Sequence, residues 1–370
     1  MNRKIKVLHV APQPPPLGGM VTYIQGLLNS DVFKIVDYDI VRANFFNKES
    51  YTGIKRFFMN ILNAVILSTV FLVKTIFWNP DIVHVQSNSG FGYFEKIWII
   101  LLARLFQKKT VLHFHGGNFI NFYNDASIFK KKLIKKGALI NDRLITGSPQ
   151  MMENWLNIGI PETKVKYIGN AVDLPDLQGK ENQKTLNVLF LTRIVIAKGI
   201  IELIDAFLDL RENYPNTRLR IVGAESLESP QIIEYLRNKD KNGYIDYIGP
   251  VSEEQKHLEY MSAEIFAFPT YVEDQSYAIM EAMSYGLSCV ASNVGGVPSL
   301  IKNMENGVLV NPQDVNSLIK GLKILYDDNL LRKSISNAAR KTIEDGFTWK
   351  KRSPEIIALY YDVINSQKPT

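Results

Sequence analysis

The chain has 370 residues, a length that predicts two domains or one unusually large one. Hydrophobic residues make up 46% and charged residues 22%, which excludes collagen-like, low-complexity and wholly disordered chains. The single cysteine, Cys289, cannot form an internal disulfide, which excludes a disulfide-stapled secreted scaffold and fits a reducing cytosol.

The net charge of +6 is divided unequally along the chain. Residues 1–180 contain 22 Lys and Arg against 12 Asp and Glu, a net charge of +10, whereas the remainder has a net charge of −4. A basic first half favours an anionic partner such as nucleic acid, a phosphorylated ligand or a membrane surface, and a solvated lysine-rich face is the plain alternative. Because no recognised nucleic-acid-binding module accompanies the charge, no nucleic-acid partner is expected.

The start of the chain has the pattern of a strand, a loop and a helix. Residues 5–10 are an apolar run, a loop rich in proline and glycine follows, and residues 20–28 have a helical pattern. The first residues lack the apolar core and cleavage site of a signal peptide, so none is expected. The loop contains Gly18 and Gly19, which would let backbone approach a ligand and aim helix amides at anionic oxygens, although a turn alone would also explain them.

Residues 57–73 form a long apolar segment. It falls just short of the about 18 residues expected of a spanning helix, and Asn60 and Asn63 interrupt it. Three interpretations stay open: a membrane span, a core helix, or a helix lying partly in a membrane interface. A monotopic or soluble protein is the working interpretation.

Strands and helices then alternate through two halves of the chain. In the first half, strands are expected at 82–85, 110–114, 144–146 and 165–168, with helices at 93–106 and 128–136. After a polar segment at 173–184 the pattern restarts, with strands at 186–191, 219–222, 244–248, 265–268 and 288–291 and a helix at 200–210. This alternation predicts an α/β fold of two Rossmann-like parallel-sheet domains, with the boundary near 178–184 and a cleft between the halves.

Two basic residues follow the strand at 186–191. Arg193 and Lys198 lie in a loop before a helix, where a guanidinium fork and an ammonium beside a helix N-terminus suit a diphosphate. Surface loops often contain such residues, so the spacing alone is a weak signal.

Two glutamates follow the strand at 265–268. Glu273 is expected in a loop and Glu281 on a helix that starts near Ser276. A loop carboxylate can accept hydrogen bonds from sugar hydroxyls, and the helix-start amides around residues 275–278 can bind phosphate. A solvated helix position is the alternative for Glu281.

Two histidines end the strand at 110–114. His113 and His115 are two residues apart and therefore share a face of the strand. No nearby acid or cysteine completes a tetrahedral set, so no metal site is expected. His115, beside Gly116 and Gly117, suits a neutral hydrogen-bonding role, whereas His113 is expected to pack in the sheet. The sequence has no Walker loop and no GxGxxG fingerprint, which argues against a P-loop NTPase and an NAD enzyme.

Taken together, these motifs resemble the family 4 retaining glycosyltransferases of the GT-B fold, of the type found in bacterial polysaccharide biosynthesis. The resemblance covers nearly the whole chain in the expected order. It rests on LTRIVIAKG, EDQSYAIMEAMSYG, HFHGG, the glycine pair at 18–19, and IGNAVD with Asn170.

The resemblance implies a role for each matching residue. It makes Arg193 and Lys198 ligands of the donor diphosphate that neutralise the leaving group. It assigns sugar hydroxyls to Glu273 and the ribose to Glu281, and it sets His115 against the donor sugar. Further donor contacts are implied for Gly18, Gly19, Asn170, Gly249, Ser276, Tyr277 and Ala278. Asn170 lies at the expected hinge, and the family needs no divalent metal.

The chain departs from the family pattern at two places. Asp274, Gln275, Ser276 and Tyr277 stand where Gly-Phe-Gly-Leu is usual, so the identity of the donor sugar is open. Ala171 stands where a glycine commonly follows Asn170.

The expected function is retaining, metal-independent transfer of a sugar from a nucleotide-sugar, with UDP as the expected nucleotide. The acceptor would be a glycan or a polyprenyl-diphosphate-linked glycan in surface polysaccharide synthesis (O-antigen, capsule or exopolysaccharide). The alternatives are a sugar-nucleotide epimerase or a phosphorylase on the same fold, and a catalytically silent nucleotide-sugar-binding protein. The last would be expected to have lost Arg193, Lys198 or Glu273.

The resemblance also implies a layout. Residues 1–178 would bind the acceptor, residues 184–350 would bind the nucleotide-sugar, and a helix in 351–370 would cross back to the first domain. The acceptor domain is expected to contact an anionic membrane through an amphipathic helix, so the enzyme is expected to be cytoplasmic and peripheral at the inner face of the cytoplasmic membrane. This helix contains Phe129, Leu133 and Ile134, flanked by Lys130, Lys131, Lys132, Lys135 and Lys136.

Overall fold

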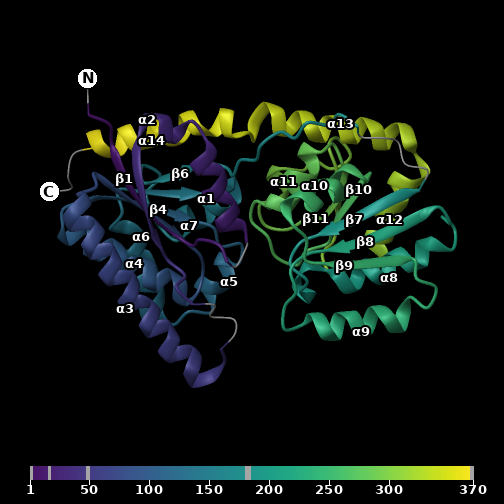
Figure 1. The fold of residues 1–370 in the computed structure, drawn as a ribbon, viewed down its shortest axis with the longest axis horizontal. Helices are drawn as coiled ribbons and strands as arrows, with labels where there is room; N and C mark the ends of the chain where they lie inside the picture. The colour runs from purple at the N-terminus through teal and green to yellow at the C-terminus, as the bar shows by residue number, and fades with distance from the viewer. Residues whose placement is uncertain (1–2, 16–17, 47–50, 180–184, 367–370) are drawn as a thin grey trace. The chain divides into compact units, whose positions relative to one another are not determined.

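The computed structural model describes residues 3–15, 18–46, 51–179 and 185–366. Contacts divide the chain into two units, one formed by residues 1–171 with 349–370 and the other by residues 172–348. Each unit contains one six-stranded sheet in which every pairing is parallel (Figure 1). The predicted α/β class with two parallel sheets is therefore confirmed.

The first unit has the strand order β2-β1-β3-β4-β5-β6. Its strands are β1 (Lys6–Ala11), β2 (Asp37–Arg42), β3 (Ile82–Ser87), β4 (Lys109–Phe114), β5 (Arg143–Thr146) and β6 (Val165–Tyr167). Its helices are α1 (Gly19–Asn29), α2 (Val32–Ile35), α3 (Gly53–Trp78), α4 (Phe91–Leu105), α5 (Phe119–Asn124), α6 (Ile128–Leu139), α7 (Pro149–Asn157) and α14 (Trp349–Asn365).

The two faces of this first sheet differ in chemistry. Because side chains alternate along a strand, Leu8, Val83 and Leu112 point to one face, where they pack with buried residues of α3, α4 and α6. Histidines 9, 84 and 113 are fully buried or nearly so on the other face, against Tyr23 of α1 and Tyr360 of α14. In Figure 1, α3 and α4 lie on the side of the sheet away from α14. The unit therefore has an apolar layer on one face and a polar aromatic layer on the other.

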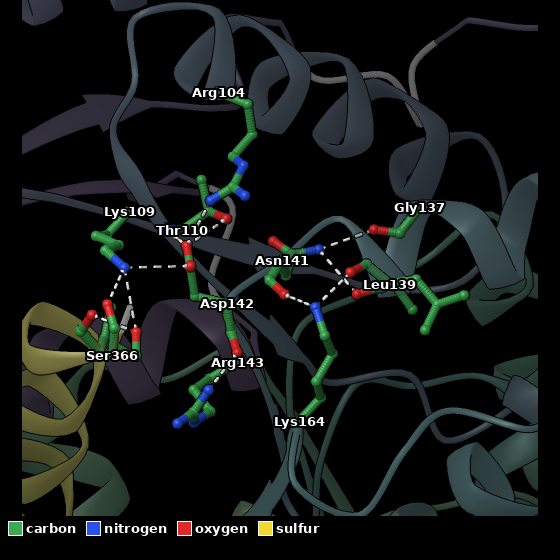
Figure 2. Close-up of polar contacts among 12 residues, drawn as sticks. Arg104, Lys109, Thr110, Gly137, Leu139, Asn141, Asp142, Arg143, Lys164 and Ser366 are labelled. Carbon is green, nitrogen blue, oxygen red and sulfur yellow. Dashed lines mark hydrogen bonds and ion pairs between the residues drawn. The ribbon is translucent and has the colours of Figure 1, made fainter. Parts of the chain in front are cut away.

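A buried carboxylate ties the start of β5 to its neighbours (Figure 2). Asp142 accepts hydrogen bonds from the Thr110 backbone N–H at 2.8 Å and from Arg104 at 2.9 Å. Lys109, 3.7 Å from Asp142, also donates to the carbonyl of Ser366 at 2.6 Å. Lys164 caps the end of α6 by donating to the Leu139 carbonyl at 2.6 Å. Ser366, which follows α14 directly, is thus fastened to the first unit.

The second unit has the strand order β12-β11-β10-β7-β8-β9. Its strands are β7 (Leu186–Leu191), β8 (Thr217–Val222), β9 (Ile245–Gly249), β10 (Ile265–Phe268), β11 (Ser288–Ser292) and β12 (Val308–Val310). Its helices are the short η2 (Ile196–Lys198) and η3 (Val297–Ser299), with α8 (Ile200–Arg211), α9 (Ser229–Lys239), α10 (Glu253–Met261), α11 (Tyr277–Ser284), α12 (Val315–Asp327) and α13 (Asn329–Gly346). Cys289 is buried in β11, and this burial raises the pKa of its thiol.

The units meet in sequence between residues 171 and 172, directly before the polar segment at 173–184 and a few residues before the expected boundary at 178–184. Val172 donates a backbone hydrogen bond to the Phe347 carbonyl at 2.9 Å and pairs with Thr348, which groups it with the second unit. Of the expected boundary 178–184, residues 180–184 lie outside the described part of the chain.

The apolar segment at 57–73 is the middle of α3. Among the described residues, α3 is the one helix long and apolar enough to cross a membrane, by length and composition only. Only 22% of its most apolar window is buried, so α3 is not the enclosed core helix that was one of the three interpretations.

Candidate functional site

Two predicted site residues form an ion pair in the second unit. Lys198 Nζ lies 2.6 Å from Glu273 Oε2, although 75 positions separate the two residues in the sequence. Lys198 ends η2 after β7, and Glu273 lies in the loop after β10, the neighbouring strand in the sheet. Parallel strands end at the same edge of a sheet, so the fold brings the two loops together.

The two loops touch because of a glycine. Gly199 has φ 74°, and a Cβ at this position would lie 1.9 Å from the Pro269 carbonyl oxygen. The backbone N–H of Tyr271 then donates to the Ala197 carbonyl at 2.9 Å. This close contact holds Lys198 beside the β10 loop.

Lys198 remains accessible to a ligand. Its side chain is 23% exposed and that of Glu273 is 20% exposed. The Lys198 ammonium also lies 5.1 Å from the centre of the Phe268 ring, which favours the cation. An incoming phosphate oxygen can therefore compete with Glu273 for the ammonium, while Glu273 becomes available to hydroxyl donors.

Arg193 is exposed in the same β7 loop. The neighbouring Ile194 N–H donates to the Ala224 carbonyl at 2.9 Å, which fixes the backbone of the loop. Gly223 passes so close to Thr192 that a Cβ would lie 1.6 Å from its carbonyl oxygen, and Gly223 N–H donates to the Gly249 carbonyl at 2.8 Å. Gly249 therefore braces the loops at this edge of the sheet.

The glutamate on α11 is held by two residues that the sequence did not reveal. Glu281 Oε1 lies 3.3 Å from Lys256 Nζ, and Glu281 Oε2 accepts from the Tyr260 hydroxyl at 3.0 Å. Burial acts to lower the pKa of Lys256, but the carboxylates of Glu281 and Glu253 outweigh it and raise the pKa. Lys256 and Tyr260 are four residues apart on α10, the spacing that puts two side chains on one helix face, but this spacing points to no particular partner.

Helix α11 begins where the sequence predicted. Ser276 is its N-cap, and its side chain accepts from the Ile279 N–H at 3.5 Å. Ser276 is buried, whereas Tyr277 and Ala278 are half-buried. The chain reaches this cap through a tight contact, because a Cβ on Gly295 would lie 1.9 Å from the Glu273 carbonyl oxygen.

In the first unit, His115 follows β4 and is held by Gln86 of β3. His115 Nε2 lies 2.6 Å from Gln86 Oε1, and the His115 backbone N–H donates to the Ser87 carbonyl at 2.8 Å. Because an amide oxygen only accepts hydrogen bonds, Nε2 is the protonated nitrogen and Nδ1 is an acceptor. Burial lowers the pKa of His115 to about 3, so the imidazole is neutral at pH 7.

His115 ends a row of four imidazoles. Ring centres are 4.9 Å apart for His9 and His84, 5.6 Å for His84 and His113, and 4.1 Å for His113 and His115. His113 is fully buried, as predicted, and stacks on His115. Burial lowers the pKa of His9 to about 3, and burial with the neighbouring histidines lowers those of His84 and His113. Among the described residues, no group of three or more His, Cys, Asp or Glu side chains could hold a metal ion.

The remaining candidates of the first unit lie at strand ends. Gly18 precedes α1, and Gly19 is its first residue; both are exposed, and no side chain caps the helix start. Asn170 is buried in the segment that follows β6. These residues and His115 belong to one unit, whereas Arg193, Lys198, Gly249, Glu273 and the α11 residues belong to the other.

One prediction about helix α6 needs correction. Ile134 is among the apolar residues of the helix expected to contact a membrane, but it is fully buried in the core of the first unit, because α6 turns this side toward the sheet. Phe129, at 70% exposure, does lie on the outward side.

Two family descriptions match consecutive stretches of the chain. Residues 17–175 match Glycosyltransferase Family 4, and residues 176–342 match Glycosyl transferases group 1. The chain belongs to the family 4 glycosyltransferases. The resemblance seen in the sequence motifs is therefore confirmed.

Three relatives show the range of proteins to which this glycosyltransferase is similar. An uncharacterized glycosyltransferase of Methanocaldococcus jannaschii is 26% identical over 59% of this chain and 59% of the relative, so the chain spans less than two thirds of that relative. An uncharacterized 41.2 kDa protein in the cps region of Klebsiella pneumoniae is 24% identical over 85% and 88% of the two chains. The UDP-Gal:alpha-D-GlcNAc-diphosphoundecaprenol alpha-1,3-galactosyltransferase of Escherichia coli is 36% identical over 28% of this chain and 26% of the relative.

Solved structures show that this glycosyltransferase has the GT-B fold. Sucrose-phosphate synthase from Thermosynechococcus elongatus matches 98% of this chain and 100% of its own, with a TM-score of 0.80 and 18% identity. Anabaena HepE, solved in complex with UDP and glucose, matches 96% of this chain and 99% of its own, with a TM-score of 0.72 and 14% identity. The predicted fold is thus confirmed over nearly the whole chain.

Proposed function

We propose that this glycosyltransferase is a retaining, metal-independent enzyme that transfers a sugar from a UDP-sugar to a polyprenyl-diphosphate-linked glycan. The product would enter the synthesis of a surface polysaccharide. The observation that carries the proposal is the contact between Lys198 and Glu273 at the edge of the second sheet. One residue supplies a cation for a departing diphosphate, and the other supplies an acceptor for sugar hydroxyls.

The residues of the second unit suit a nucleotide-sugar. Lys198 and the exposed Arg193 share one loop and together supply two cations for a diphosphate. Glu281 offers carboxylate oxygens to a ribose, and Lys256 with Tyr260 fixes their orientation. UDP is the proposed nucleotide because the Escherichia coli relative is named for a UDP-sugar and HepE was solved with UDP.

The proposed reaction needs no metal to balance charge. The bond between the anomeric carbon and the diphosphate oxygen breaks as an acceptor hydroxyl oxygen bonds to that carbon from the same face. The hydroxyl proton passes to the departing phosphate oxygen, and the ammonium and guanidinium groups neutralise the charge that develops there. His115, held neutral with Nδ1 free of a proton, would accept a hydrogen bond from a sugar hydroxyl.

The acceptor and location follow from the relatives and from charge. The Escherichia coli relative is named for a diphosphoundecaprenol acceptor, and the Klebsiella relative for a cps region. Helix α6 of the first unit has five lysines and no carboxylate, which suits an anionic surface. The proposal therefore includes a peripheral position at the inner face of the cytoplasmic membrane.

A thermal-shift panel of nucleotides and UDP-sugars tests this proposal, because a ligand that binds only the folded state raises the melting temperature. UDP and one UDP-sugar are expected to raise it. The Lys198→Ala variant is expected to lose that shift and to reduce transfer about a hundredfold or more, because the leaving diphosphate loses its cation.

Lys320→Ala is the matched control, since Lys320 is exposed on α12 of the same unit. It should keep both the shift and the activity. Wild-type transfer by Lys198→Ala, with the fold intact by circular dichroism, would remove the assignment.

A further inference from the structure

Helix α3 exposes an apolar surface that the transfer reaction does not use. Most of its buried positions lie in its second half, whereas its first three turns point large apolar side chains outward. We call these residues the α3 apolar surface: Ile54, Phe57, Phe58, Ile61, Leu62 and Val65, each 43–76% exposed. Exposed apolar residues gathered in this way mark an interaction site rather than an ordinary surface.

The α3 apolar surface continues onto helix α4. Trp98 of α4 is 51% exposed, and its indole N–H donates to the Ser68 hydroxyl of α3 at 3.2 Å. Leu101 and Leu105 follow at helical spacing on α4 and are also exposed. Next to α4 lies α6, whose Gly137 packs on Ile97. Three neighbouring helices therefore form one outer face.

The charged residues on α3, α4 and α6 indicate which kind of partner binds this outer face. Helices α3, α4 and α6 contain a single carboxylate, Glu95, and it is buried beside Lys96 at 3.3 Å. The basic residues that these helices expose include Lys55 and Arg56 at the start of α3 and, on α6, Lys130, Lys132 and Lys136. Three helices whose exposed charged residues are all cations match a bilayer that contains anionic lipid.

A second copy of the chain fits this face poorly. A symmetric dimer would oppose the same patch on both copies, so the cationic border of one copy would meet that of the other. Anionic headgroups satisfy these cations directly, and lysine stems can extend from an apolar surface toward them.

The topology decides whether α3 spans a membrane or lies in the membrane interface. Helix α3 connects β2 to β3, and both strands pair with β1 in the same sheet. Leu67 and Phe71 of α3 are fully buried in the core, so the helix cannot leave the sheet without unfolding the unit. Asn63 is also occupied, since its amide donates to Glu95 at 2.6 Å and to the Ala43 carbonyl at 3.0 Å.

We infer that the chain is monotopic: α3 lies in the plane of an anionic bilayer, with the α3 apolar surface and Trp98 in its interfacial region and the α6 lysines on its headgroups. This deepens the proposed function, because it names the surface on which a lipid-linked acceptor would be met. The α6 lysines alone would give a purely electrostatic contact. The α3 apolar surface adds a contact that salt does not screen.

Sedimentation of the full chain with vesicles tests the inference. The vesicles are phosphatidylcholine alone or phosphatidylcholine mixed with phosphatidylglycerol. Phe57→Ser/Phe58→Ser is expected to lower the partition coefficient about tenfold or more on both kinds of vesicle, because two apolar side chains are lost from the interface. Lys131→Glu/Lys132→Glu should lower binding only where phosphatidylglycerol is present.

The matched control is Leu227→Ser/Leu330→Ser, which removes two leucines that are 83% and 80% exposed in the second unit. This control should bind vesicles like the wild type. Brominated lipid should quench tryptophan fluorescence in the wild type and quench it much less in Trp98→Phe, because Trp98 is the one tryptophan of the four that is exposed.

Two results would overturn the inference. One is equal vesicle binding by Phe57→Ser/Phe58→Ser and the wild type. The other is a stable dimer of the lipid-free wild type that the same variant converts to a monomer, since the occupant would then be a second copy. The UDP thermal shift is measured on the wild type in parallel: a UDP shift without any vesicle binding sinks only this inference, and vesicle binding without any nucleotide shift sinks only the proposed function.

Discussion

The hydrogen bond between Gln86 and His115 determines the tautomer of His115, a candidate donor-site residue. Gln86 is buried in β3, and its carbonyl oxygen receives the proton on His115 Nε2. Nδ1 is therefore the ring nitrogen whose lone pair can accept a hydrogen bond from a sugar hydroxyl. Gln86 acts on the ligand only through His115, which makes it a positioning residue.

Substitution of Gln86 separates positioning from simple packing. Gln86→Leu nearly preserves the side-chain volume but removes the acceptor, so kcat/KM for the donor is expected to fall about tenfold or more. Gln86→Glu keeps the acceptor, and its negative charge favours the imidazolium. The acid limb of its pH–rate profile should therefore move to higher pH. A melting-temperature change in both variants with unaltered kinetics would show that Gln86 only packs.

The sequence predicted individual site residues more readily than it predicted the side chains that contact them. Lys198 and Glu273 were both predicted site residues, because a cation in a loop before a helix suits a diphosphate and a carboxylate in a loop suits sugar hydroxyls. Their direct contact was not predicted, since only the fold shows that the two loops meet. Gln86 and Lys256 were missed for the same reason: each acts through a side chain more than 20 positions away.

At the scale of elements, the start of α8 depends on one backbone conformation. Gly199 ends η2 and precedes α8, and it combines a left-handed φ with contact against the Pro269 carbonyl. Any side chain here would strain the backbone and push the β7 loop away from the β10 loop.

Gly199→Ala is expected to lower the free energy of unfolding by at least about 2 kcal/mol, because the left-handed conformation and the steric clash both oppose a methyl group. It should also weaken the UDP thermal shift by moving Lys198. Gly346→Ala is the control, since nothing lies within 4 Å of that position at the end of α13. Urea unfolding measures both variants, and equal midpoints for Gly199→Ala and the wild type would contradict the expectation.

Elements with strong apolar runs were predicted nearly to the residue. Strands β7 and β10 match their expected ranges because they are central and buried on both faces. The edge strand β2 was missed, since aspartates alternate along its first half and only one of its six residues is buried, and β12 was missed because it has only three residues. The burial of α3 could not be predicted either, because lipid-facing and core-facing helices share the same composition.

At the scale of the whole molecule, histidine and tryptophan are distributed unevenly between the units. All four tryptophans lie at positions 78, 98, 155 and 349, within the first unit. Four of the five histidines also belong to that unit, and His257 alone belongs to the second. Tryptophan fluorescence therefore reports the unfolding of the first unit, whereas far-ultraviolet circular dichroism reports both.

Acid is expected to destabilise the first unit selectively. The folded pKa values of His9 and His115 are about 3, and those of His84 and His113 are also lowered, while an unfolded histidine titrates near 6.5. Between these values the unfolded chain binds more protons than the folded chain, so stability falls as the pH falls. From pH 7.5 to pH 5 the loss is about 2 kcal/mol for each histidine that stays neutral in the folded state.

Urea unfolding at the two pH values, followed by both signals, measures this effect. At pH 5 the fluorescence midpoint should fall below the circular dichroism midpoint, because a two-unit chain need not unfold in one step. His113→Phe keeps an aromatic ring in the row and removes one titrating group, so it should reduce the pH-dependent drop in the fluorescence midpoint. His257→Gln, in the second unit, should leave that drop unchanged. If His113→Phe and the wild type lose the same stability between pH 7.5 and pH 5, the row of imidazoles is not the origin of the acid sensitivity.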